Sequence, residues 1–148
     1  MTTTQSATQE ATPKTIARTG GCHCGAVRYE VALAPDVGGS QCNCTICTKI
    51  GAVATIAKPA ALKVVAGEAE LTEYRWGGEI SRRFFCRRCG IHCFARGHLA
   101  ELGGDYVSVN LLTIDEMDPA TLTVVHWDGR HDNWYAGARS TPWPVMAG

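Results

Sequence analysis

Seven of the eight cysteines in this chain of 148 residues are gathered in three short clusters. The clusters read CHCG, CNCTIC and CRRCG, and they begin at Cys22, Cys42 and Cys86. A disulfide framework spreads its cysteines along the chain, and two cysteines separated by one residue do not readily close an unstrained disulfide. Metal sites instead group their ligands at such spacings. The cysteines therefore predict a fold organised by bound metal.

The first and third clusters together supply a complete set of four thiolates. In CRRCG, Cys86 and Cys89 have the spacing of a zinc knuckle, and Gly90 can take the left-handed backbone conformation that the turn requires. In CHCG, an extended backbone would place Cys22 and Cys24 on the same face. Because such a four-cysteine site closes a long loop, we expect its metal to be structural.

The central cluster supplies three thiolates from one short segment, Cys42, Cys44 and Cys47. A structural zinc site is almost always closed by four protein ligands, whereas a catalytic site keeps one position for water or substrate. Three local cysteines therefore predict an open, catalytic site. Iron also binds four cysteines, but soft ligands in tetrahedral geometry favour zinc, so we expect two zinc ions in the chain.

The eighth cysteine, Cys93, leaves two interpretations of the central cluster open. As a fourth ligand it would close the central site and make both metals structural. It also lies between Ile91 and Phe94, on the segment that leaves the CRRCG turn, where a small buried residue fits well. Packing in the core is the favoured interpretation.

Apolar residues outside the clusters mostly alternate with polar ones, as they do in β-strands, and no long segment has helical spacing. The predicted strands cover residues 26–33, 51–57, 62–67, 71–76 and 105–112, and a further strand ends at Trp127. The segments on the two sides of CRRCG form a hairpin, residues 34–41 a loop and residues 115–122 one helical turn. The predicted fold class is mainly β.

Composition narrows the classes of function. Lys plus Arg and Asp plus Glu number 14 each, and this zero net charge argues against a nucleic-acid partner. No apolar run approaches the length of a membrane span. Residues 1–15 lack the apolar region of a secretory signal and predict a disordered tail. We therefore expect a single zinc-binding domain over residues 16–148, in the cytoplasm.

Basic side chains near the clusters are candidate contacts for an anionic thiol substrate. Five basic residues lie in or beside the clusters: Lys49, Arg82, Arg83, Arg87 and Arg88. They could balance the negative charge of the metal sites, bind substrate carboxylates, which arginine does in bidentate fashion, or lie in solvent, and we take Lys49, Arg82 and Arg83 as the candidate substrate contacts. Because successive strand residues point to opposite faces, at most one of the two arginines faces the site. His126 and His131 are candidate general bases, or ordinary surface or core histidines. Four aromatic residues are expected to close the far end of the core, with the wall of a pocket as the alternative: Trp127, Trp134, Tyr135 and Trp143.

Three ordered cysteine blocks carry a family resemblance. The segments GGCHCGAVRYEV, CNCTICTKIGA and FFCRRCGIHCF, followed by HWDGRHDNWY and a late PWP, resemble the glutathione-dependent formaldehyde-activating enzyme family. The resemblance covers about residues 17–144. It implies an Mss4-like fold of small antiparallel sheets with a zinc-ribbon-type knuckle and two zinc sites.

The resemblance also implies roles for the cysteines and a reaction. The structural zinc would be bound by Cys22, Cys24, Cys86 and Cys89, and the catalytic zinc by Cys42, Cys44 and Cys47. The implied activity is that of a carbon–sulfur lyase, which condenses formaldehyde or a related small aldehyde with glutathione to give S-hydroxymethylglutathione. The alternative is a non-catalytic, zinc-stabilised module that binds other proteins or acts like a chaperone.

Overall fold

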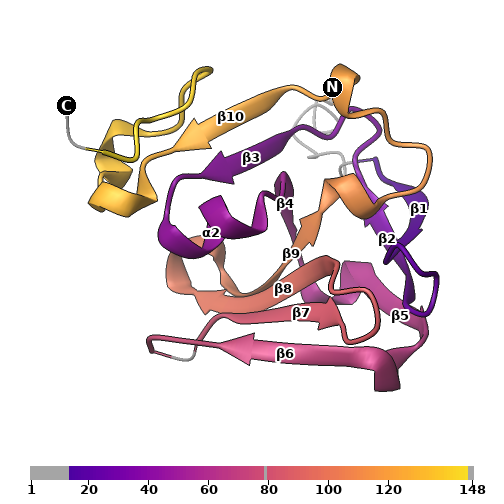
Figure 1. Ribbon diagram of the computed structural model, residues 1–148. Helices are drawn as coiled ribbons and strands as arrows, with labels where there is room; N and C mark the ends of the chain where they lie inside the picture. The colour runs from indigo at the N-terminus through magenta and orange to yellow at the C-terminus, as the bar shows by residue number, and fades with distance from the viewer. Residues whose placement is uncertain (1–13, 79, 147–148) are drawn as a thin grey trace, which may run out of the picture.

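The computed structural model describes residues 14–78 and 80–146 and is built mainly from two β-sheets (Figure 1). The smaller sheet has the strand order β1-β2-β5, and both of its strand pairs are antiparallel. Its strands are β1 (Ile16–Gly21), β2 (Arg28–Leu33) and β5 (Leu62–Ala66). The predicted mainly β fold class is confirmed.

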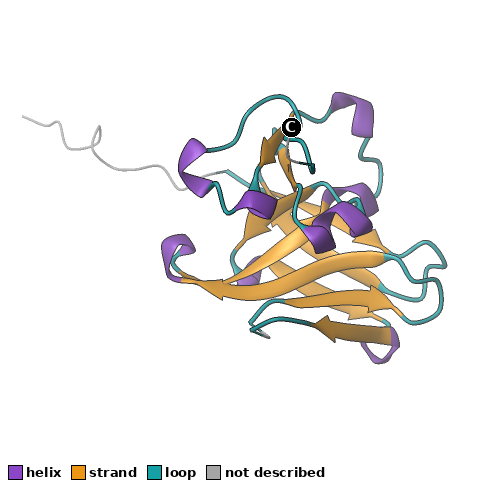
Figure 2. Ribbon diagram, turned by 60° about the vertical axis from the view of Figure 1, so that its left-hand side comes forward, coloured by secondary structure: helices purple, strands orange, loops and turns teal. Residues whose placement is uncertain are grey.

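The larger sheet has the strand order β10-β3-β4-β9-β8-β7-β6, and Figure 2 shows it twisting across the molecule. Its strands are β3 (Gly39–Cys42), β4 (Ala54–Ala57), β6 (Leu71–Arg75), β7 (Arg82–Cys86), β8 (His92–Leu99), β9 (Gly104–Asn110) and β10 (Val124–Trp127). Neighbouring strands are antiparallel except β10 and β3, which run parallel. As a result, β3 lies between β4 and a strand from near the C-terminal end.

The hydrophobic core joins the two sheets. Alternate residues of β2 and β9, namely Tyr29, Val31, Val107 and Val109, are buried in one cluster. The ring of Tyr29 meets the ring of Phe94 on β8 edge to face, with centroids 6.4 Å apart. Because the buried residues alternate along both strands, each sheet has one apolar face, and the sheets pack through these faces.

One α-helix, α2 (Thr45–Ile50), lies between β3 and β4 in the described part of the chain (Figure 1). Gly51 ends the helix with a left-handed backbone conformation, φ 74°, and its N–H donates to the carbonyl of Cys47 at 2.9 Å. The sequence pattern does not predict this helix, because six residues are too few to show a periodic apolar face.

Most other elements match the predictions. Strands β2, β4, β5, β6 and β9 lie within a few residues of the predicted ranges, β7 and β8 form the CRRCG hairpin, and a short helical turn covers Pro119–Thr121. Strands β1 and β3 were not predicted. Strand β3 begins inside the predicted loop 34–41, where the N–H of Gly39 donates to the carbonyl of Thr123 at 2.9 Å. Because β3 is held by residues more than 80 positions later in the chain, the sequence around it does not predict a strand.

Two predictions concern the chain outside the sheets. The predicted disordered tail, residues 1–15, lies outside the described residues except for Lys14 and Thr15, which have no regular structure. Among the residues that the structure describes, no helix has the length and apolar character needed to cross a membrane.

Candidate metal centres

Four cysteines from two distant segments lie together. Cys22 and Cys24 lie between β1 and β2, Cys86 ends β7, and Cys89 lies in the turn between β7 and β8. Their sulfur atoms all lie within 4.8 Å of one another. The Sγ–Sγ distance is 3.6 Å between Cys22 and Cys24 and 3.7 Å between Cys24 and Cys86. Sulfurs at about 2.3 Å from a tetrahedral zinc lie about 3.8 Å apart, so this group fits zinc.

Backbone amides around the four-cysteine group favour thiolates. The N–H of Val27 donates to Sγ of Cys22 at 3.2 Å. Backbone hydrogen bonds from Cys24 and Ile91 lower the pKa of Cys89 to about 6. Thiolates are the form in which cysteine binds metal, so the backbone of both segments prepares the group for an ion.

Cys22 and Cys24 reach this group through a turn, which corrects the predicted extended segment. The N–H of Gly25 donates to the carbonyl of Cys22 at 3.3 Å, and Gly25 has φ 84°, a conformation that favours glycine. The turn reverses the chain between β1 and β2 and brings both sulfurs to the side of Cys86. The two sulfurs of the C-x-C motif therefore reach the same side because the chain turns there, and not because they alternate along a strand.

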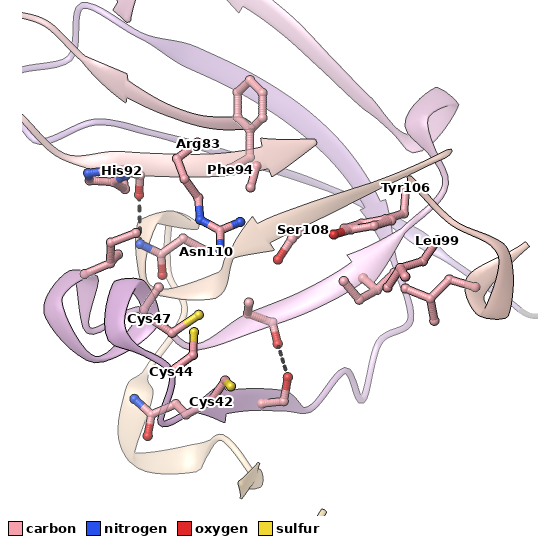
Figure 3. Close-up of a pocket in the computed structure, with 18 of the residues that line it drawn as sticks. Cys42, Cys44, Cys47, Arg83, His92, Phe94, Leu99, Tyr106, Ser108 and Asn110 are labelled. Atoms are coloured by element: carbon pink, nitrogen blue, oxygen red, sulfur yellow. Dashed lines mark hydrogen bonds between the residues drawn. The ribbon is translucent and has the colours of Figure 1, made fainter. Parts of the chain in front are cut away.

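The central group is assembled around the start of α2. Cys42 ends β3, Cys44 is the residue that precedes α2, and Cys47 lies within it. Their sulfurs lie within 4.8 Å of one another, and Figure 3 shows them gathered at one place. Residues three apart on a helix share a face, which brings Cys44 and Cys47 together. Within the described residues, no fourth cysteine, histidine or carboxylate completes the group.

The central sulfurs are hydrogen-bonded to one another and lie near a cation. Hydrogen bonds from Cys42 and then Cys47 lower the pKa of Cys44. The hydrogen bond with Cys44 raises the pKa of Cys42, and the bonds with Cys42 and Cys44 raise the pKa of Cys47 more strongly. The charge of Arg83 favours the thiolate at both Cys44 and Cys47. The first thiolate of the group therefore forms at Cys44, and two further soft sulfur donors lie beside it, as a zinc site requires.

Cys93 is fully buried and lies beside the four-cysteine group. Burial, and then the nearby charges of Cys22, Cys86 and Cys89, raise the pKa of its thiol to about 12. A thiol that stays protonated in the core packs as a small apolar residue. Of the two interpretations left open by the sequence, the structure places Cys93 in the core, outside the central group.

A cavity of about 310 Å³ lies beside the central group, and all three cysteines line it (Figure 3). Figure 3 shows the sulfurs and Arg83 toward one end, and Tyr106 and Leu99 at the other. The remaining lining residues are Ser40, Gln41, Ile50, Ala52, Ala54, Ile56, His92, Phe94, Ala95, Leu102, Ser108, Asn110 and Trp134. A small molecule in this cavity has direct access to the central sulfurs.

Of the three predicted basic contacts, Arg83 reaches this cavity. Its guanidinium donates to Ser81 Oγ at 2.6 Å and lies 5.9 Å from the centre of the Trp76 ring. Arg82 points to the other face of β7 and pairs with Glu73 at 3.8 Å. Lys49, at the exposed end of α2, does not line the cavity. Strand alternation thus separates two adjacent arginines.

A second cavity, of about 220 Å³, touches two of the central cysteines and the C-terminal segment. It is lined by His126, Trp127 and Trp143, whereas Trp134 lines the larger cavity and Tyr135 is 92% exposed. These aromatic residues form cavity walls or lie in solvent, which corrects the prediction that they close the far end of the core.

A polar network that was not predicted holds the C-N-C segment of the central group. Asn43 Nδ2 donates to Asp128 Oδ1 at 2.7 Å, and the backbone N–H of Arg130 donates to Asn43 Oδ1 at 2.9 Å. His131 Nδ1 lies 2.6 Å from the same oxygen of Asp128, which is only 5% exposed. His131 is therefore engaged in the network, and the polar run HWDGRHDN was the available sequence signal.

Comparison with known proteins agrees with this arrangement. The family model described as glutathione-dependent formaldehyde-activating enzyme matches residues 17–129, a range that contains both cysteine groups. A crystal structure of a Rhodobacter sphaeroides protein has 34% sequence identity and a TM-score of 0.64, and the match covers 74% of this chain and 98% of that chain. The chain therefore belongs to the glutathione-dependent formaldehyde-activating enzyme family.

Proposed function

We propose that this protein is a zinc-dependent enzyme that joins a thiol such as glutathione to formaldehyde or a related small aldehyde. With these substrates the product is S-hydroxymethylglutathione, and the reverse reaction is that of a carbon–sulfur lyase. The proposed structural zinc is bound by Cys22, Cys24, Cys86 and Cys89, and the proposed catalytic zinc by Cys42, Cys44 and Cys47.

The observation that carries this proposal is that three clustered cysteines, with no fourth ligand among the described residues, line a cavity. A zinc site that served stability alone would be closed by a fourth protein ligand, as the four-cysteine group is. The family to which the chain belongs supplies the expected pair of substrates.

The side chains of the cavity support an addition reaction. Zinc bound by the central group would lower the pKa of a substrate thiol or polarise a carbonyl oxygen. Arg83 places a positive charge near Cys44 and Cys47, where it stabilises a substrate thiolate or the oxyanion formed from the aldehyde. The cavity walls hold the two reactants close together, which reduces the entropic cost of their meeting.

The addition needs no redox cofactor, because no electrons are gained or lost overall. The sulfur lone pair of the thiolate forms the new bond to the carbonyl carbon. The π-electron pair of the carbonyl moves to the oxygen, which then takes up the proton that the thiol released. The product is a hemithioacetal.

Exchange NMR tests the proposal directly. Zinc-loaded wild-type protein at catalytic concentration should raise the rate of interconversion between formaldehyde plus glutathione and their adduct, in both directions, without moving the equilibrium. Cys44→Ser should abolish the acceleration, because it removes one of the three central ligands. An uncatalysed rate in the presence of fully loaded wild-type protein would reject the formaldehyde–glutathione assignment.

Cys93→Ala is the matched control, because it removes a cysteine that belongs to neither group. Loss of a small buried side chain should lower stability by about 1 kcal/mol. The zinc content and the exchange rate should remain at wild-type values. A loss of zinc from this variant would instead show that Cys93 is a ligand.

A further inference from the structure

We infer that the larger cavity binds the apolar body of an aldehyde substrate, and that the enzyme prefers aldehydes of roughly ten non-hydrogen atoms to formaldehyde. This inference rests on the proposed function, because it assumes that the carbonyl meets the thiol at the central cysteines. It is carried by the size, the lining and the charge of the cavity.

The cavity is much larger than formaldehyde needs. Its volume is about 310 Å³, whereas a water-sized atom group occupies roughly 30 Å³ in a liquid. Formaldehyde has only two non-hydrogen atoms and would leave most of this space filled with water. Space for roughly ten such atoms suits an aliphatic or aromatic aldehyde with a body beyond its carbonyl group.

The far end of the cavity is apolar. Figure 3 shows Leu99 and Tyr106 at the end away from the sulfurs, and Leu102, which also lines the cavity, ends the short helical turn that directly follows Leu99. The side chains of Ile56 and Ala95 add to the same lining. Leu99 and Leu102 are 45% and 41% exposed, so a bound hydrocarbon group would remove their apolar surface from water.

The charge of the lining favours the aldehyde over the thiol as the occupant of this end. Arg83 is the charged residue among the described residues that line the cavity, and no aspartate or glutamate accompanies it. Burial, and then the charge of Arg83, lower the pKa of His92, which therefore stays neutral. Glutathione carries two carboxylates and an ammonium group, which an apolar wall cannot satisfy.

These features define an orientation for the aldehyde. Its carbonyl lies at the sulfur end, near Cys44 and Arg83, and its hydrocarbon body extends toward Leu99 and Leu102. The thiolate sulfur then forms a bond to the carbonyl carbon, and the oxygen takes up the proton released by the thiol. Atoms and electrons balance as they do for formaldehyde, so only the group attached to the carbonyl differs.

The test compares formaldehyde, hexanal and phenylacetaldehyde as substrates with glutathione, using zinc-loaded protein. We expect kcat/KM for the two larger aldehydes to exceed that for formaldehyde by at least about tenfold. Leu102→Asp should lower the ratio of kcat/KM for the larger aldehydes to kcat/KM for formaldehyde about tenfold, because a charge in the wall is unfavourable for a hydrocarbon body. The matched control is Leu112→Asp, since Leu112 is similarly exposed, at 42%, but does not line the cavity.

A binding measurement supplies a second readout. Octan-1-ol has a similar hydrocarbon body but no reactive carbonyl. In ¹⁵N-labelled, zinc-loaded protein, it should shift the amide signals of Leu99, Leu102 and Tyr106 and leave that of Leu112 in place. Shifts distributed over the whole surface, with none at these three residues, would overturn the inference.

The outcomes separate this inference from the proposed function. Acceleration with formaldehyde alone would overturn the inference and leave the proposed function standing. Acceleration with the larger aldehydes alone would support the inference and remove formaldehyde as the substrate. No acceleration with any of the three aldehydes would overturn both.

Discussion

Arg82 and Arg83 are neighbours on β7, yet their surroundings have little in common. Arg83 lines the larger cavity and lies near the central cysteines, whereas Arg82 pairs with Glu73 of the adjacent strand. Side chains of successive strand residues point to opposite faces, so a one-residue shift of β7 would exchange the two roles. At the scale of the residue, the electrostatics of the site therefore depend on strand register.

Replacing each arginine by methionine tests this assignment. Arg83→Met should lower kcat/KM roughly tenfold or more, the size expected for loss of one charge-assisted contact in the transition state. Arg82→Met should change it less than about twofold, since its ion pair is exposed. Steady-state kinetics with one thiol and one aldehyde give the comparison, and equal effects of the two variants would contradict it.

The two cysteine groups join different kinds of element. The four-cysteine group connects the β1–β2 turn of the smaller sheet to the β7–β8 hairpin of the larger sheet. The central group connects the end of β3 to the α2 that directly follows it. A metal that links distant segments contributes more to folding than one held by a single segment.

Cysteine substitutions should therefore differ in their effect on stability. Cys86→Ser should leave an incomplete zinc shell and unfold the domain or lower its Tm by more than about 10 °C. Cys44→Ser should lower Tm by no more than a few degrees, because the segment around it is short and local. Thermal unfolding followed by circular dichroism measures both, and similar losses would argue against different roles for the two groups.

Hydrogen bonds from the region of Asp128 fix the segment that contains Cys42 and Cys44. Asp128 and Asn43 hold the C-N-C segment from the side of the C-terminal chain. Groups that orient metal ligands typically affect metal affinity 10- to 100-fold, so Asp128→Asn should weaken zinc binding at the central group about tenfold. Competition with a chromophoric chelator measures the affinity. The control is Asp36→Asn, in an exposed loop, for which we expect wild-type affinity.

The sequence pattern predicted those elements that are determined by residues close together in the chain. The alternation of Tyr29 and Val31 revealed β2, and the C-x-x-C-G motif revealed the β7–β8 turn. Strand β3 depends on a parallel partner near residue 124, and α2 is too short for periodicity, so neither had a readable pattern. The same limit hid the contact of Asn43 with Asp128, because it joins residues far apart in the chain.

For the molecule as a whole, the structure predicts two metal ions of unequal lability. Fully reduced protein should bind two zinc ions per chain, one for each cysteine group. An excess of chelator should remove them in two phases, with the central ion leaving first, because its group has three ligands and lines a cavity. Colorimetric zinc release measures the phases, and Cys44→Ser should lack the fast one. A single phase releasing one ion would remove the central site.

The parallel pairing of β3 with β10 also affects the order in which the two cysteine groups can form during synthesis. All four ligands of the four-cysteine group have been made once the ribosome passes residue 89, but β10, which flanks the strand carrying Cys42, begins only at Val124. Chains fold from the N-terminal side as they emerge. The four-cysteine group and the strands up to β9 can therefore form while β10, beside the central group, has not yet been made. The proposed reaction would therefore become possible only after β10 has been added.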